Sequence, residues 1–124
     1  MQRLEERAKQ EYLICDGGMG TQLHELGLAP GECPESWCLE KPELVKSVHE
    51  AYRKAGSLIV ETNTFGGNRY KLAHYGLDSQ ADAINRAGAA LGRAVAGQTQ
   101  YVMASVGPTG ALVADRPGSV TAFS

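Results

Sequence analysis

Three short apolar runs, each passing into a polar loop that contains glycine, are the feature that most constrains the fold of this 124-residue chain. The runs cover residues 12–15, 58–62 and 101–106, and the loops read DGGMG, ETNTFGG and VGPTG. Strands that are apolar along their length and separated by helices are typical of a parallel sheet covered on both faces. The order therefore predicts an α/β fold. Its three loops are expected at the C-terminal ends of the strands, where parallel folds place their functional groups.

Helical patterns occupy the segments between these runs. Pro42 opens the clearest one, because proline at the first helical position loses no hydrogen bond. Leu44, Val48 and Tyr52 then form an apolar stripe, and Gly56 is expected to cap the C-terminus. Further helices are expected over residues 2–9, 21–26, 68–75 and 80–96, and a loop rich in proline and glycine over residues 27–38.

Charge and composition narrow the class of protein. The formal net charge of −2 gives no indication of nucleic acid or of an anionic membrane. No apolar run approaches the roughly 18 residues that a membrane span needs. The first residues, MQRLEERAKQ, have no apolar signal-peptide core, so we expect a cytoplasmic protein.

The chain has 3 cysteines, Cys15, Cys33 and Cys38, and an odd number in a cytoplasmic protein favours free thiols. Cys33 and Cys38 are separated by four residues and could form half of a zinc site, but no second pair follows at zinc-like spacing. Cys15 lies in an apolar run and is expected in the core.

The loop DGGMG allows several interpretations. A dinucleotide fingerprint needs a third glycine where this chain has Leu23, and a phosphate loop needs a Gly-Lys-Ser/Thr ending that is missing. In a third interpretation, Asp16 accepts a substrate ammonium while the amides of Gly17 and Gly18 hold a carboxylate. A structural alternative stays open, in which Asp16 caps the next turn and the glycines only supply positive φ angles.

The second strand end raises the same question. Glu61, Thr62 and Asn63 could line a pocket or could bond to neighbouring loops. The three histidines lie on helical stretches without a partner pattern for a catalytic triad or a metal site. We expect His49, which is flanked by residues of a helix surface, to be solvated or packed.

Four motifs in order and spacing add a resemblance. The chain contains LICDGGMGTQL, PESW, KPELVKSVHEAYRKAGSLIVETNTFGGNRYKLAHYGL and ASVGPTG. Together, from about Tyr12 to about Leu112, they resemble the opening of the homocysteine S-methyltransferase family. The similarity is closest to the N-terminal homocysteine-binding module of cobalamin-dependent methionine synthase.

The resemblance implies a (β/α)8 TIM barrel in which Zn²⁺ activates the thiol of homocysteine. The methyl group would come from methylcobalamin and methyltetrahydrofolate on other domains, or in relatives from a betaine or sulfonium donor. Asp16, Gly17 and Gly18 match the residues with which the family holds the amino acid. Glu61, Thr62 and Asn63 match a segment near the pocket.

The chain also departs from the family pattern. The resemblance places the zinc ligands on late strands, one in an Asn-Cys context and two in a Gly-Gly-Cys-Cys stretch, and this chain has neither. We therefore assign no metal ligand and no catalytic residue here. A complete barrel takes about 250 residues. We expect residues 1–11 to be a helical extension and residues 12–124 to be a partial barrel domain, truncated at the C-terminus, with about three βα units.

The last residues, ADRPGSVTAFS, do not continue the barrel pattern. The remaining C-terminal part of the barrel is then a partner that this fragment needs, and we expect the fragment alone to transfer no methyl group. Two alternatives remain, a non-catalytic binding module that has lost the zinc half, and a fragment of an unrelated TIM-barrel enzyme.

Overall fold

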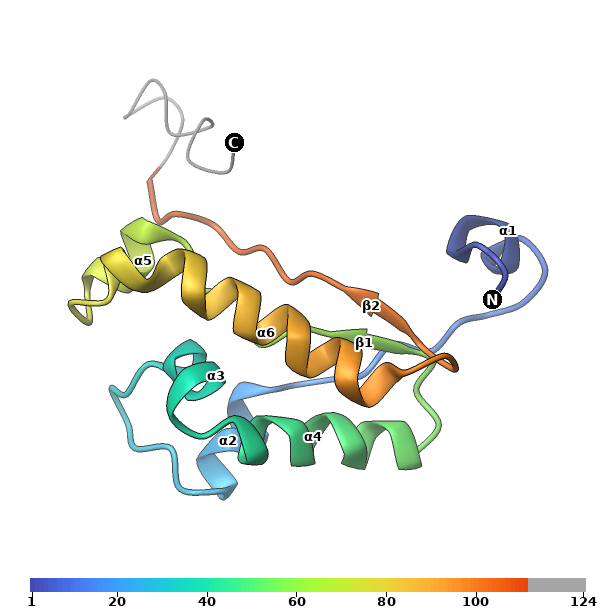
Figure 1. Cartoon of the computed structure of the whole chain (residues 1–124), viewed down its shortest axis with the longest axis horizontal. Helices are drawn as coiled ribbons and strands as arrows, with labels where there is room; N and C mark the ends of the chain where they lie inside the picture. The colour runs from blue at the N-terminus through green and yellow to red at the C-terminus, as the bar shows by residue number, and fades with distance from the viewer. Residues whose placement is uncertain (112–124) are drawn as a thin grey trace.

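The computed structural model describes residues 1–111, which form a mixed α/β unit (Figure 1). Helices predominate, and the two strands are short. In chain order the elements are α1 (Leu4–Ala8), α2 (Gly20–Glu25), a 3₁₀ turn (Pro34–Ser36), α3 (Trp37–Glu40), α4 (Pro42–Lys54), β1 (Ile59–Glu61), α5 (Arg69–Ala73), a second 3₁₀ turn (Asp78–Gln80), α6 (Ala81–Ala96) and β2 (Tyr101–Met103).

The strands confirm the predicted parallel pairing. β1 lies beside β2 in a register that aligns Ile59 with Tyr101 and Glu61 with Met103. On its other side, Ile59 forms an isolated parallel bridge with Cys15. The three apolar runs of the sequence are therefore neighbours in space, and the chain leaves all three at the same edge.

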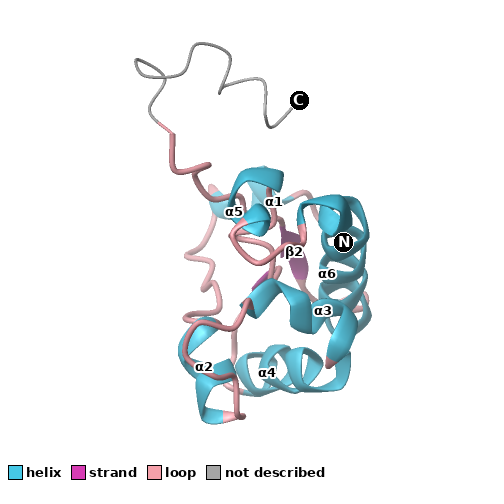
Figure 2. Ribbon diagram, turned by 90° about the vertical axis from the view of Figure 1, so that its left-hand side faces the viewer, coloured by secondary structure: helices cyan, strands magenta, loops and turns pink. Residues whose placement is uncertain are grey.

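Helices α3, α4 and α6 pack together, and α6 also lies against both strands (Figures 1 and 2). Close approach of α6 depends on two glycines. A Cβ atom on Gly92 would lie 3.3 Å from Val102 Cγ1, and one on Gly88 would lie 2.5 Å from Thr64 Cγ2. The two glycines thus let the backbone of this helix reach the strands and the loop after β1.

Two apolar clusters form the core. The larger one joins α2, α3 and α4, and the smaller one lies between α5 and the start of α6. The larger cluster consists of Leu23, Leu28, Trp37, Val45 and Val48, and the smaller of Cys33, Leu72 and Ile84.

The expected strand over residues 12–15 is wrong in extent, because only Cys15 makes a bridge. Tyr12 is 99% exposed and Ile14 is 64% exposed. Cys15 is also exposed, which overturns its expected place in the core. None of residues 12–15 is buried and only Leu13 is half-buried, so this run gains little from packing.

The loop expected over residues 27–38 is wrong in its second half, where the 3₁₀ turn runs directly into α3. Pro34 stands in the first turn, where its missing N–H costs nothing. Trp37 is fully buried and its Nε1–H donates to Glu32 Oε1 at 2.7 Å. Burial of this large ring holds a segment that local composition alone assigns to a loop.

The other helices lie within two or three residues of their expected bounds. Gly56 and Gly97 follow α4 and α6 with φ of 107° and 53°, which confirms them as helix-ending residues. Within residues 1–111, no helix has the length and apolar character to cross a membrane. The expectation for ADRPGSVTAFS lies outside the described residues.

Candidate functional site

A cavity of about 290 Å³ opens beyond the ends of the strands. It is lined by groups that follow each of the three apolar runs, together with residues of the 3₁₀ turn before α3. Those most relevant to binding are Gly17, Glu35, Glu61, Thr62, Asn63 and Ser105. Four of the residues predicted from sequence therefore meet in one place, as parallel strands require.

Asp16 lies beside this cavity, but its carboxylate is directed at the backbone of β1. Both oxygens accept a hydrogen bond from the Glu61 N–H at 3.1 Å. Burial raises the pKa of Asp16 to about 6, the Glu61 N–H opposes that shift, and the Glu61 charge adds to it. The carboxylate thus joins the first run to β1 and keeps part of its acceptor capacity unused.

His49 is the residue that sequence reasoning missed. It lies on α4, its side chain is 0% exposed, and neither ring nitrogen has a hydrogen-bond partner in the described part of the chain. Its Nδ1 is 3.9 Å from Asp16 Oδ2, and burial lowers the pKa of the imidazole. His49 lies on the same buried face of α4 as Val45 and Val48, and this spacing is the sequence signal that could have predicted its burial.

The glycines after Asp16 do not behave as the structural alternative expects. Neither Gly17 nor Gly18 has a positive φ, and no side chain caps the start of α2. Instead, the hydroxyl of Tyr52 donates to the Gly18 carbonyl at 2.7 Å, and a Cβ on Gly17 would lie 3.2 Å from that hydroxyl. Gly17 has little room for a side chain because α4 approaches this loop closely.

Thr62 and Asn63 are engaged in holding the loops. Thr62 Oγ1 lies 2.6 Å from Thr64 Oγ1 and accepts from the Ser105 N–H at 3.1 Å. Thr64 Oγ1 is 2.8 Å from the Ser105 carbonyl, and Asn63 Nδ2 donates to the Pro34 carbonyl at 2.9 Å. These contacts form what we call the strand-end network, which fixes the cavity wall.

Glu61 differs from its two neighbours. Its side chain is half-buried at the cavity, and within residues 1–111 its carboxylate has no hydrogen-bond partner. Glu35, which was not singled out from the sequence, is buried, and its Oε1 accepts from the Gly66 N–H at 2.7 Å. The cavity is therefore lined by two carboxylates, one free and one partly used.

The described residues do not fit a zinc site. Within residues 1–111, no three His, Cys, Asp or Glu side chains gather closely enough to hold a metal ion. Cys33 and Cys38 are buried, and Cys38 donates to the Asn63 carbonyl at 3.3 Å. Burial raises the pKa of Cys38 to about 12, so it stays a thiol, whereas zinc binds the thiolate.

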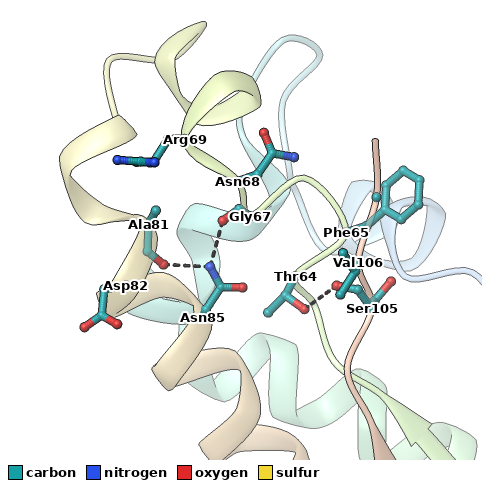
Figure 3. Close-up of a pocket in the computed structure, with 11 residues that line it drawn as sticks. Thr64, Phe65, Gly67, Asn68, Arg69, Ala81, Asp82, Asn85, Ser105 and Val106 are labelled. Atoms are coloured by element: carbon teal, nitrogen blue, oxygen red, sulfur yellow. Dashed lines mark hydrogen bonds between the residues drawn. The ribbon is translucent and has the colours of Figure 1, made fainter. Parts of the chain in front are cut away.

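A second, larger cavity of about 490 Å³ lies between the start of α6 and the loops after β1 and β2 (Figure 3). Several of its polar groups are already bonded. Asn85 Nδ2 donates to the carbonyls of Gly67 and Ala81, both at 2.7 Å (Figure 3). Asp82 pairs with Arg86, which lies outside the cavity lining. The smaller cavity, with its free carboxylate, is the better candidate for ligand chemistry.

Comparison with known proteins identifies the family. Residues 13–124 match the profile described as "Homocysteine S-methyltransferase". The chain belongs to the homocysteine S-methyltransferase family. It is 32% identical over 115 residues to a methionine synthase of Mycobacterium leprae (strain TN), covering 83% of this chain and 10% of that protein.

A methionine synthase of Mycobacterium tuberculosis (strain ATCC 25618 / H37Rv) is 32% identical over 111 residues, 80% of this chain and 9% of that protein. The family member described here thus spans about a tenth of the length of these relatives. The homocysteine methyltransferase MmuM from Escherichia coli, in its metallated form, matches with a TM-score of 0.73 and 29% identity. That match covers 90% of this chain and 43% of the MmuM chain, and the oxidized form gives a TM-score of 0.71.

Proposed function

We propose that this chain is the N-terminal part of the homocysteine-binding (β/α)8 barrel of an enzyme that forms methionine. Residues 12–124 contribute about three βα units to that barrel, and residues 1–11 are an extension before it. The parallel order of the three runs and the partial match to MmuM support the proposal. The cavity at the shared strand ends is the single observation that carries it.

The polar head of homocysteine would bind at this cavity. Asp16 and Glu61 offer acceptors to the α-ammonium group, and the amides of Gly17 and Gly18 offer donors to the α-carboxylate. Thr62 and Asn63 would shape the wall through the strand-end network. Anchoring the amino acid at this end aims its thiol at the reacting centre, which is how a binding site lowers the barrier of a bimolecular step.

Zinc and the methyl donor would be held by residues outside the described part. Zinc, when bound, converts a thiol near pKa 8.5 into a reactive thiolate at neutral pH. Within residues 1–111, Cys15, Cys33 and Cys38 form no ligand set, and the role that we assign to this segment is substrate binding. We propose methylcobalamin and methyltetrahydrofolate as the source of the methyl group, on the resemblance of the sequence motifs.

The test is homocysteine binding by isothermal titration calorimetry on the full-length protein. Substitution of Asp16 by Asn keeps the size of the side chain and removes its charge. We expect binding about 10- to 100-fold weaker, the usual effect of removing a charge-assisted hydrogen bond. Glu25→Gln, an exposed change on α2, is the matched control. Equal affinity of wild type and Asp16→Asn would remove Asp16 from the substrate site.

A further inference from the structure

The strongest unexplained feature of the molecule is the buried imidazole of His49. Its side chain is 0% exposed, and within residues 1–111 both ring nitrogens lack a hydrogen-bond partner. Buried polar atoms in folded proteins are almost always paired, so each exception needs a reason. A histidine kept only for packing would be replaceable by an apolar side chain without loss.

The nearest charged group gives that reason. His49 Nδ1 stands 3.9 Å from Asp16 Oδ2, and the Asp16 side chain is only 2% exposed. This distance is roughly 1 Å longer than a hydrogen bond between nitrogen and oxygen. The two groups face each other from α4 and from the end of the first apolar run, with no other described polar atom bonded to the imidazole.

Asp16 is held from only one direction. Among the described residues, its two oxygens share a single donor, the Glu61 N–H, at 3.1 Å. The other charged group acting on it is the Glu61 carboxylate, and the Cys15 thiol is also close enough to sense both carboxylates. Burial raises the pKa of Asp16 to about 6, the Glu61 charge adds to that shift, and burial lowers the pKa of His49. Near pH 7 the pair is therefore an Asp16 carboxylate facing a neutral imidazole.

We propose that His49 is a positioning residue that donates its Nδ1–H to the Asp16 carboxylate when Asp16 takes up the ammonium group of an amino acid. The inference rests on the proposed function and adds a residue to that site. An arriving ammonium needs an ionised, correctly aimed carboxylate, and a neutral imidazole is a donor that carries no competing positive charge. The carboxylate is then fixed between the Glu61 N–H and His49.

The test separates this role from simple packing by using two ligands in calorimetry on the full-length protein. One ligand is L-homocysteine, and the other is 4-sulfanylbutanoate, which keeps the thiol and carboxylate but has no ammonium. His49→Leu removes the donor, and His49→Asn places an amide N–H near the position of Nδ1. His74→Asn, an exposed change, is the control.

We expect His49→Leu to weaken homocysteine binding about 10- to 100-fold, with 4-sulfanylbutanoate bound as by wild type and His49→Asn restoring most of the loss. Unchanged binding of the analogue also shows that the variant is folded. Equal weakening of both ligands, or no rescue by His49→Asn, would make His49 a packing residue and would leave the proposed function intact. Absence of homocysteine binding by the folded wild-type protein would overturn both proposals.

Discussion

Two regions at the C-terminal ends of the strands use the same kinds of side chain in opposite ways. In the strand-end network, the hydroxyls of Thr62 and Thr64 and the amide of Asn63 are bonded to each other or to backbone. In the Asp16–His49 pair, two fully enclosed side chains face each other without a hydrogen bond. The first region has its donors in use, and the second has unused bonding capacity.

This difference separates structural polar groups from binding groups. A satisfied network resists change, because removing one member leaves its partner buried and unpaired. A pair with unused donors and acceptors contributes less to stability and can accept a ligand at lower cost. The sequence left open whether Glu61, Thr62 and Asn63 line a pocket or bond to neighbouring loops. Thr62 and Asn63 bond to the loops, whereas within residues 1–111 Glu61 keeps a free carboxylate at the cavity.

The largest expected effect comes from pushing α6 away from the strand-end network. In Gly88→Ala, the new Cβ would lie 2.5 Å from Thr64 Cγ2 and 3.4 Å from Cys38 Sγ. The alanine gains up to about 1 kcal/mol in helix propensity, but overpacking costs about 1–3 kcal/mol or more. We expect a net loss of about 2 kcal/mol in the free energy of unfolding, measured by urea denaturation.

Gly20→Ala is the control for this change, because nothing lies within 4 Å of a Cβ at that position. It should leave the urea midpoint within experimental error or raise it. A Gly88→Ala protein as stable as wild type would show that α6 can move without disturbing Thr64, and that the network is less rigid than its contacts suggest.

The next effect contrasts two neighbouring side chains directly. Asn63→Ala removes the donor to the Pro34 carbonyl, and we expect a loss of about 1–2 kcal/mol in the free energy of unfolding. Glu61→Gln removes no such bond and should change that free energy by less than about 0.5 kcal/mol. Homocysteine affinity should respond in the reverse order. If Glu61→Gln destabilised the protein as much as Asn63→Ala, the distinction between the two side chains would fail.

The last effect is a pH dependence that belongs to the Asp16–His49 pair. The pKa of Asp16 is raised from 3.8 to about 6, so between these values the native state binds more protons than the unfolded chain. The contribution of Asp16 to stability is therefore present in acid and falls as the pH rises through this window. Asp16→Asn removes the group, so its stability relative to wild type should increase from pH 4 to pH 6 and then level off.

Urea denaturation of both proteins at intervals of pH measures this difference. The lowered pKa of His49 has the opposite sign, because the unfolded chain takes up a proton below about pH 6.5 and wild-type stability falls there. His49→Asn on both backgrounds separates the two contributions, since groups in contact are not additive. A stability difference that decreases from pH 4 to pH 6 would mean that Asp16 is ionised in the native state.

Local patterns predicted much of this molecule from the sequence. Pro42, the stripe of Leu44, Val48 and Tyr52, and Gly56 located α4 almost to the residue, because helix periodicity and caps depend on neighbours along the chain. Parallel order followed from the alternation of apolar runs and helices, and the meeting of Gly17 and Glu61 followed from that order. The sequence motifs also led to the correct family.

Local patterns could not predict where each side chain points or which groups lie against it. Asp16, Thr62 and Asn63 were found as polar groups at strand ends, but only their contacts show which of them are already bonded. His49 was passed over because nothing on its own helix pairs with it. Its partner lies thirty-three positions earlier, and only the packing of α4 against the first run brings them together.

The sequence by itself determined the family, the parallel α/β order and the edge at which the candidate site forms. These depend on periodicity, on turn residues and on motif spacing, all of which can be read from the linear order of the residues. The tertiary structure decided that Cys15 is exposed, that Trp37 and the 3₁₀ turn before it are helical, and that Asp16 faces His49. Burial is a property of what lies against a residue, and distant segments meet only when the chain has folded.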